Sequence, residues 1–377
     1  AWAVQREGGG RGFATTCGHF YDNWQNDNFR KTILNALAWA SHVEVPEHGV
    51  ESDFVSREEI AAHLRLADLV AAEAEPSADD TTYAEEPYWY KPGHPLRPAE
   101  PQSISAVPGF HVEKVYSVPE AYGSWTAMTV DDRGRLICAA QHKPGLYRLT
   151  LGPAKHEIAV ERLGESAEQL GWSHGLLYAF DSLYVTVSEG NDSVTGGVYR
   201  LRDLDGDDQF ESVEQLFELN TAGEHGPHNL VVGPDGKSLY IMCGNGTQLP
   251  DGITRYRPSR TEGRDHLMPA GFGESEYRTA GFVMKFAPDG SQREIVCSGL
   301  RNSYDLAFHQ AGDLFTFDSD MEWDLGAPWY RPTRICHLLG GGEFGWREDA
   351  AKWPEYYEDS VRPVVNIGPA SPTGVVF

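Results

Sequence analysis

From residue 109 onward, short runs of alternating apolar and polar residues repeat along the chain. Four of them share one shape: WTAMTVDDRGRLICAA, LLYAFDSLYVTVSEG, HNLVVGPDGKSLYIMCG and YDLAFHQAGDLFTFDSD. Each begins with an alternating strand, passes through a polar turn and opens a second strand. Repeats of roughly 40–50 residues with three or four strands each are typical of a β-propeller. The pattern predicts a mainly β fold, a partial β-propeller of four or more blades over residues 109–377.

The first 44 residues predict a small N-terminal α/β piece. A glycine turn separates two short β runs, and a helix follows from about Asn28 to Ser41. Its predicted apolar face consists of Phe29, Ile33, Leu34 and Leu37.

Residues 45–108 predict a connector between these two parts. Ser56 and Glu59 form a capping box at the start of a helix, and a linker rich in proline and acid follows it. At the other end, the closing PASPTGVVF predicts the first strand of another blade. We therefore expect the propeller to be incomplete at the C-terminus.

Charge excludes several classes of partner. The 377 residues include 56 acidic and 31 basic side chains, for a net charge of −25, which disfavours nucleic acid and anionic membrane surfaces. No run of 18 apolar residues predicts a membrane span. The five cysteines contain no C-x-x-C pair, which favours buried free thiols over a metal or haem site.

Two pairs of residues carry candidate chemistry. Glu224 and His225 stand directly before one repeated strand, and Arg301 and Asn302 stand at the same place before the next. These connections lie at one end of a propeller channel, so we expect His225 and Arg301 to face one cavity. A neutral histidine can take the proton of an alcohol, and a guanidinium can stabilise negative charge on an acceptor. His228 competes for the role of base.

The chain resembles two known families. The region from residue 109 onward resembles the glucose/sorbosone dehydrogenase propellers. Four segments carry this resemblance: HGPHNLVVGPDG, GLRNSYDLAF, WDLGAPWYRPTRICHLLGGGEFGW and SPTGVVF. The likeness is greatest to the membrane-bound dehydrogenase branch found in planctomycete and verrucomicrobial genomes. The opening AWAVQREGGGRGFATTCGHFYDNW resembles the C-terminal end of ThuA-like domains, which have a glutamine-amidotransferase-like fold.

The first resemblance implies an oxidoreductase that uses pyrroloquinoline quinone with Ca²⁺ on a sugar or polyol. It implies that His225 is the base, Glu224 the acid that orients it, and Arg301 and Asn302 the quinone contacts, with Gln141 as a further pocket residue. It also implies a periplasmic or otherwise exported protein, with a haem c electron-acceptor domain outside this chain.

Two acidic segments are candidate metal sites. The segment SDMEWD replaces the family's calcium-binding step; in a strand, Asp320, Glu322 and Asp324 would share one face, which suits Ca²⁺, although a solvated acidic loop fits equally well. The segment DLDGDDQFESVE places carboxylates at positions 1, 3, 5 and 12 of a calcium loop. These are Asp203, Asp205, Asp207 and Glu214. Its glycine stands at position 4 rather than 6, which predicts a hairpin loop at a blade edge.

Three functions of different classes remain open from the residues. The first is a quinone-dependent sugar or polyol dehydrogenase. The second is a calcium-dependent propeller hydrolase of the lactonase type, in which His225 activates water. The third is a non-catalytic propeller that binds carbohydrate or protein.

Overall fold

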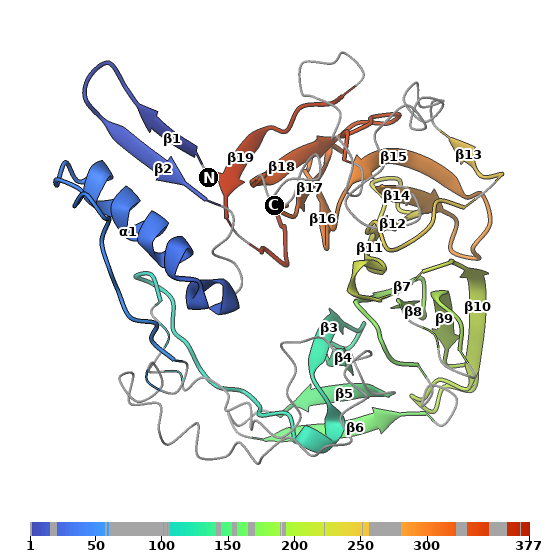
Figure 1. Ribbon diagram of the computed structural model, residues 1–377. Coiled ribbons are helices and arrows are strands. Elements are labelled where there is room, and N and C mark those ends of the chain that lie inside the picture. The colour runs from blue at the N-terminus through green and yellow to red at the C-terminus, as the bar shows by residue number, and fades with distance from the viewer. Residues whose placement is uncertain are drawn as a thin grey trace. The chain divides into compact units, whose positions relative to one another are not determined.

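The computed structural model describes most of the chain (Figure 1). The segments outside the described residues are 1, 16–20, 57–58, 60–100, 102–103, 105, 141–144, 153–156, 165–169, 189, 191–193, 222, 251, 256–279, 322–329, 347–359 and 370. Two compact units are present, Ala1–Ser105 and Ala106–Phe377. None of the described helices is long and apolar enough to cross a membrane.

The N-terminal unit contains a β-hairpin and one long helix. Its elements are β1 (Trp2–Gln5), β2 (Arg11–Ala14), the 3₁₀ helix η1 (Tyr21–Gln25) and α1 (Asp27–Ala40). Asn26 caps α1 by accepting a hydrogen bond from the backbone of Phe29.

The predicted apolar face of α1 is only partly correct, because Leu37 is exposed whereas Arg30 is buried. The Arg30 guanidinium donates to the carbonyl oxygens of Trp24 and Ser52, and these bonds compensate its burial. The predicted capping box is also made: the Ser56 backbone donates to Glu59, and the Glu59 backbone donates to the Ser56 hydroxyl.

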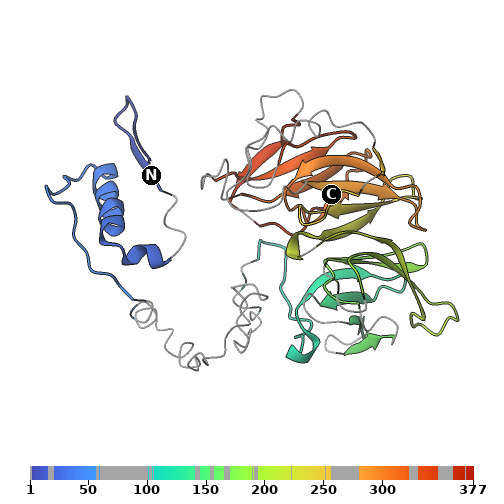
Figure 2. The same cartoon turned by 45° about the vertical axis from the view of Figure 1, so that its right-hand side comes forward.

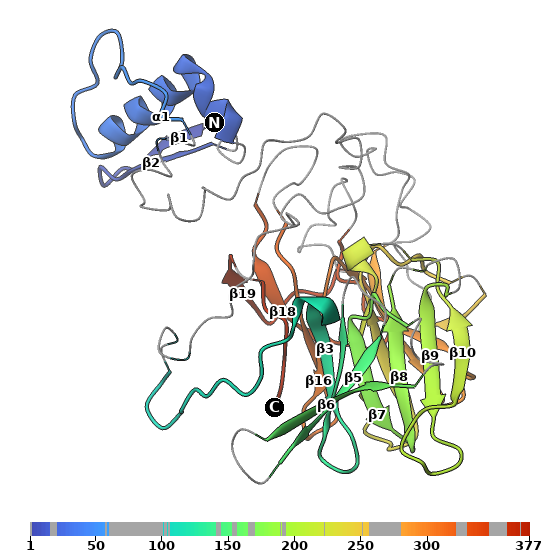
Figure 3. The ribbon, with the colours of Figure 1, turned by 90° about the horizontal axis from the view of Figure 1, so that it is seen from below.

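The second unit is a propeller arrangement of four antiparallel blades, which confirms the predicted fold class. In each blade the strand nearest the centre comes first in the chain (Figure 1). Blade 1 contains β3 (Trp125–Val130), β4 (Leu136–Ala140), β5 (Leu146–Leu151) and β6 (Ile158–Leu163), preceded by η3 (Glu120–Tyr122). Blade 2 contains β7 (Gly175–Ala179), β8 (Ser182–Val187), β9 (Gly197–Arg202) and β10 (Ser212–Glu218), whose strands run side by side in Figure 3.

The third and fourth blades follow the same order. Blade 3 contains β11 (Pro227–Val232), β12 (Leu239–Cys243), β14 (Gly281–Phe286) and β15 (Glu294–Leu300), preceded by η5 (Gly223–His225). The short β13 (Thr254–Arg255) pairs in parallel with β15 at its outer edge. Blade 4 contains β16 (Leu306–Phe308), β17 (Leu314–Asp318), β18 (Thr333–Leu338) and β19 (Val365–Gly368).

The core lies between neighbouring blades, whose sheets pack through their faces (Figure 2). Successive side chains of a strand point to opposite faces, so a middle strand serves two cores at once. In β8, Leu183 and Val185 pack with blade 1, whereas Tyr184 packs with blade 3. This double burial explains why the second strand of each repeat is almost uniformly apolar. The four cysteines in the described residues are likewise buried free thiols.

Neighbouring inner strands approach closely where β7 begins. A Cβ atom built on Gly175 would lie 2.2 Å from the carbonyl oxygen of His228 in β11. Glycine is therefore required at this position for the blades to keep their spacing.

We predict that Gly175→Ala separates blades 2 and 3 and lowers the free energy of unfolding by about 1–3 kcal/mol. The melting temperature should fall by roughly 2–10 °C, measured by calorimetry. Gly374→Ala is the matched control, since the nearest atom to its added Cβ would be Asp305 Oδ2 at 3.8 Å. Equal melting temperatures for the two variants would contradict the close approach.

Candidate functional site

The candidate residues lie on two equivalent connections between blades. Glu224 and His225 end η5, just before β11. Arg301 and Asn302 follow β15, just before β16. Each pair therefore leads into the innermost strand of its blade, as the repeats predict.

One three-residue segment after β12 joins the two connections. The Asn245 backbone N–H donates to the carbonyl of Arg301 at 2.8 Å, and the Gly246 N–H donates to the carbonyl of His225 at 2.9 Å. A Cβ atom at Gly244 would lie 2.6 Å from the His225 carbonyl oxygen and 2.7 Å from Asn302 Oδ1. The structure thus brings His225, Arg301 and Asn302 together around residues 244–246.

Asn245 also holds the ring of His225. His225 Nδ1 donates to Asn245 Oδ1 at 2.6 Å, which leaves the lone pair of the neutral ring on Nε2. The resemblance assigns this orienting contact to Glu224, but the structure gives it to Asn245. The sequence offers only a weak signal for Asn245, because an Asn-Gly step after a strand is normally a turn.

The electrostatic surroundings keep His225 neutral. Burial lowers the pKa of His225 to about 4, and the nearby Arg301 guanidinium adds to this effect. Glu224 is affected in the opposite sense: burial raises the pKa of its carboxyl, and Arg301 opposes the rise. Burial is the main cause of both shifts, and the Arg301 guanidinium acts to lower the pKa of both residues.

His228, the competing candidate for the base, is completely buried. Its Nδ1 lies 2.8 Å from the carbonyl oxygen of Ser303, and its Nε2 lies 2.8 Å from the carbonyl oxygen of Glu224. Both ring nitrogens are therefore occupied by backbone oxygens. Of the two histidines, only His225 is arranged to accept a proton from a bound molecule.

Arg301 is fixed by the end of β17. Its backbone N–H donates to Asp318 Oδ1 at 2.8 Å, and its Nη1 donates to the Asp320 carbonyl at 2.7 Å and to Ser319 Oγ at 3.3 Å. Asp318 is itself held in a buried ion pair with Arg334 at 2.8 Å. Of the acids predicted to bind Ca²⁺ here, Asp320 is the one described, and its carbonyl accepts from Arg301.

Three predicted site residues lie outside the described residues. These are Gln141, Glu322 and Asp324.

The acidic loop between β9 and β10 gathers four carboxylates. Oxygen atoms of Asp203, Asp205, Asp207 and Glu211 all lie within 4.8 Å of one another. Glu214, the predicted fourth member, does not belong to this group. It lies inside β10 opposite Arg200, and its Oε2 pairs with Arg200 Nη2 at 2.6 Å. The loop closes at Glu211 because β10 already begins at Ser212.

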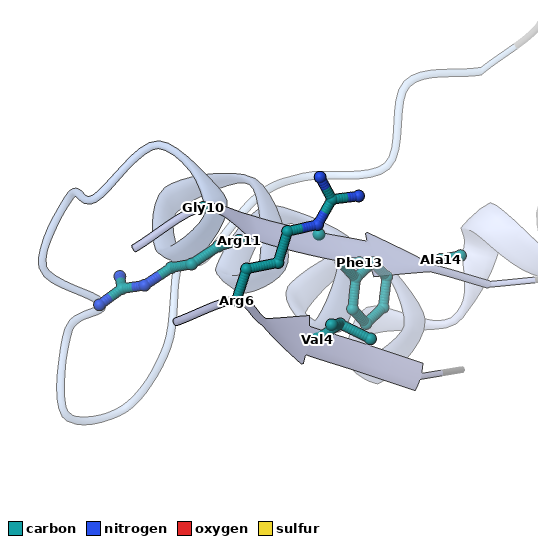
Figure 4. A pocket seen from close by; sticks show the side chains of 7 residues that line it. Val4, Arg6, Gly10, Arg11, Phe13 and Ala14 are labelled. Atoms are coloured by element: carbon teal, nitrogen blue, oxygen red, sulfur yellow. The ribbon is translucent and has the colours of Figure 1, made fainter. Parts of the chain in front are cut away.

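A cavity of about 440 Å³ lies on the hairpin of the N-terminal unit (Figure 4). Its lining includes Val4, Arg6, Arg11 and Phe13. The two guanidinium groups point away from each other, and Arg11 donates to the carbonyl of Trp39. The two arginines therefore do not form a joint anion site.

Comparison with known proteins gives matches among solved structures alone. The chain matches no protein-family model, and no curated protein matches it. The PQQ-bound aldose sugar dehydrogenase of Streptomyces coelicolor is 16% identical, with 65% of this chain and 68% of that chain covered and a TM-score of 0.42. The pyranose dehydrogenase PQQ domain of Coprinopsis cinerea is 11% identical, with 66% of each chain covered and a TM-score of 0.43.

The soluble aldose sugar dehydrogenase of Escherichia coli is 17% identical, with 66% of this chain and 73% of that chain covered and a TM-score of 0.42. This chain thus spans 66% to 73% of the length of these three proteins. Because the TM-scores are all below 0.5, we take the function from the side chains of the site.

We predict that Asn245→Asp raises the pKa of His225 from about 4 by roughly one to three pH units, because a carboxylate on Nδ1–H favours the charged ring. The His225 Cε1–H resonance, followed by NMR against pH, measures this change. Asn245→Ala should move the pKa the other way, since it removes the acceptor. A His225 titration that is the same in all three proteins would show that residue 245 does not hold the ring.

Proposed function

We propose that residues 109–377 form the dehydrogenase domain of a sugar or polyol oxidoreductase that uses a quinone cofactor of the pyrroloquinoline type. The observation that carries this proposal is the junction at residues 244–246. It ties the ring of a neutral histidine and the backbone carbonyl of Arg301 to the same short segment at the entrance to two inner strands. A proton acceptor beside a fixed cation is the pair of groups that oxidation of a hydroxyl needs.

The donor set suits a planar, electron-poor cofactor with negatively charged oxygens. Arg301 offers a fixed guanidinium, the best matched side chain for such oxygens. Asn302 Oδ1 is buried and no described group donates to it, so it is a candidate acceptor for an N–H of a bound molecule. Arg301 and Asn302 would hold the cofactor, which when bound supplies the acceptor for hydride from the substrate carbon.

His225 is the proton acceptor in this proposal. With Nδ1–H donated to Asn245, Nε2 accepts the proton of the substrate hydroxyl as that carbon is oxidised. The pKa of about 4 ensures that the ring is unprotonated at neutral pH. The fixed contact to Asn245 keeps the ring from rotating and so maintains the reactive orientation.

Arg301 has two roles in the same proposal. Its charge stabilises negative charge that develops on the acceptor oxygens, and it disfavours protonation of His225 before substrate arrives. Its contacts with Asp320 and Ser319 hold the guanidinium in place in advance, so that little reorganisation accompanies the reaction.

The wider context of the proposal follows from the motif resemblance. We propose that residues 1–44 are the C-terminal part of a ThuA-like domain, that the protein is exported, and that a haem c domain outside this chain is the electron acceptor.

The proposal predicts quinone-dependent dye reduction with aldoses or polyols by the purified chain supplied with pyrroloquinoline quinone and Ca²⁺. His225→Asn should lower kcat by about 10²- to 10⁴-fold and leave quinone affinity within a few-fold. Arg301→Met should weaken both, because the guanidinium acts in binding and in charge stabilisation. His111→Asn is the control, since the His111 side chain is 80% exposed.

Two results would contradict this assignment. One is lactone hydrolysis that needs Ca²⁺ alone, which would favour the hydrolase. The other is wild-type protein that binds no quinone by calorimetry and reduces no dye, which would favour a non-catalytic propeller.

We also propose that the loop of Asp203, Asp205, Asp207 and Glu211 binds a structural Ca²⁺. Oxygen ligands gathered within 4.8 Å of one another suit a hard cation, and a cation would relieve their mutual repulsion. Ca²⁺ at 100-fold over its Kd should stabilise the fold by about 2.7 kcal/mol, seen as a higher melting temperature than in chelator.

Substitution of two glutamates distinguishes this ligand set, which ends at Glu211, from the set predicted from the sequence, which ends at Glu214. Glu211→Gln should abolish the response to Ca²⁺, whereas Glu214→Gln should keep it because Glu214 pairs with Arg200. If the wild-type protein has the same melting temperature in Ca²⁺ and in chelator, the proposed calcium site is contradicted.

A further inference from the structure

The buried ring of His228 connects the two segments that carry the candidate catalytic pair. Its Nε2 contacts the carbonyl oxygen of Glu224, the residue before His225, at 2.8 Å. Its Nδ1 contacts the carbonyl oxygen of Ser303, two residues after Arg301, at 2.8 Å. These contacts lie on two different connections, one leading into blade 3 and one into blade 4. A single side chain therefore contacts both of the connections on which His225 and Arg301 lie.

His228 belongs to a layer of rings that the repeats place at equivalent positions. Each ring stands two residues before a buried leucine of an innermost strand: His174 before Leu176, His228 before Leu230 and Tyr304 before Leu306. The rings of His228 and Tyr304 stack with centroids 4.6 Å apart, and those of His228 and His174 lie 5.3 Å apart. The layer holds the His228 ring in one orientation from both sides.

Donation from both ring nitrogens at once requires two protons on the ring. A carbonyl oxygen can only accept, and a neutral imidazole has a single N–H. Two ring nitrogens at 2.8 Å from two carbonyl oxygens are both donors only in the imidazolium form. Both carbonyls act to raise the pKa of His228, against the larger lowering effect of burial. Loss of the second proton would remove the hydrogen bond from the ring to one of the two connections.

We propose that His228 is a positioning residue that sets the spacing of His225 and Arg301 by donating from both ring nitrogens to the connections that carry them. Residues 244–246 tie the same connections through their own backbone bonds. The two ties act at different points of each connection, and together they fix both the separation and the relative rotation of the pair. The kinetic consequences rest on the proposed dehydrogenase function, but the tie itself does not.

The charge of His228 also acts on His225. The segments that contact His228 carry the titratable groups Glu224 and His225 on η5, His174 before β7, and Arg301 and Tyr304 before β16. Positive charge on His228 lowers the pKa of His225, as does that of Arg301. Removing the His228 ring nitrogens should therefore raise the pKa of His225.

The first test uses the wild-type protein without added cofactor. Long-range ¹H–¹⁵N NMR spectra distinguish an imidazolium, protonated on both nitrogens, from a neutral ring, and His228 is assigned by its loss in His228→Phe. Because burial lowers the pKa of His228 below the ordinary histidine value, we expect the doubly protonated pattern in acid, at pH 5. A singly protonated His228 at that pH would overturn the proposal without bearing on the dehydrogenase assignment.

The second test compares His228→Phe with His174→Phe. Both variants keep an aromatic ring in the same layer, but only the first removes the contacts to Glu224 and Ser303. In the cofactor-free proteins, the NMR titration of His225 should move upward in His228→Phe and stay closer to wild type in His174→Phe. Equal titrations in the two variants would overturn the proposal.

The kinetic arm applies once quinone-dependent turnover is established. His228→Phe should lower kcat by roughly 10- to 100-fold, the range expected for a small misplacement of catalytic groups, while the KM for sugar changes less than threefold. His228→Gln, which retains one donor, should fall between wild type and His228→Phe. A change in KM alone, or full activity in His228→Phe, would contradict the positioning role. Absence of turnover in the wild type would instead count against the dehydrogenase function.

Discussion

The buried carboxylate of Asp318 holds the part of blade 4 on which the site depends. Its Oδ1 accepts from the backbone N–H of Arg301 and from the hydroxyl of Ser303, and its Oδ2 accepts from the guanidinium of Arg334. A buried charge left without its partner costs about 3–5 kcal/mol, so Asp318 and Arg334 are each required by the other. Arg334 extends the network by donating to the carbonyl of Gly299. The connection from Gly299 to Ser303 is thereby fixed before any ligand binds.

Backbone and side-chain contacts together transmit this order to His225. The carbonyl of Arg301 accepts from the backbone of Asn245, and the side chain of Asn245 accepts from the ring of His225. The chain of contacts from Arg334 to His225 therefore passes through Asp318, Arg301 and Asn245. It crosses from blade 4 to blade 3 at a place where a glycine, Gly244, allows the close approach. The arrangement of the candidate residues in this region is a consequence of how the blades pack.

The position of the site in the fold can be predicted from the sequence, whereas most of the hydrogen bonds among its residues cannot. Repeats fix topology, and topology puts the residue before each innermost strand at one end of the channel, so His225 and Arg301 could be paired from spacing alone. Asn245 could not, because its role depends on β12 ending beside Arg301, a contact between chain segments far apart in sequence. The prediction for the acidic loop was wrong only at its last member, for a related reason: Asp203, Asp205 and Asp207 belong to the cluster and Glu214 does not. Spacing rules for helix-loop-helix sites favour Glu214, but the strand that begins at Ser212 removes it from the loop.

The identity of residue 245 has a chemical consequence for His225, the proposed base. A carboxylate at this place would orient the ring and also make it a stronger proton acceptor, as in a Ser-His-Asp triad. The amide of Asn245 orients the ring without that gain, and burial and Arg301 lower the pKa of His225 to about 4. Such a ring is unprotonated over nearly the whole range in which proteins stay folded, but it has a low affinity for the proton it takes. In the proposed dehydrogenase, the oxidation would therefore draw its driving force from the electron acceptor rather than from the base, because the cofactor would perform the redox chemistry.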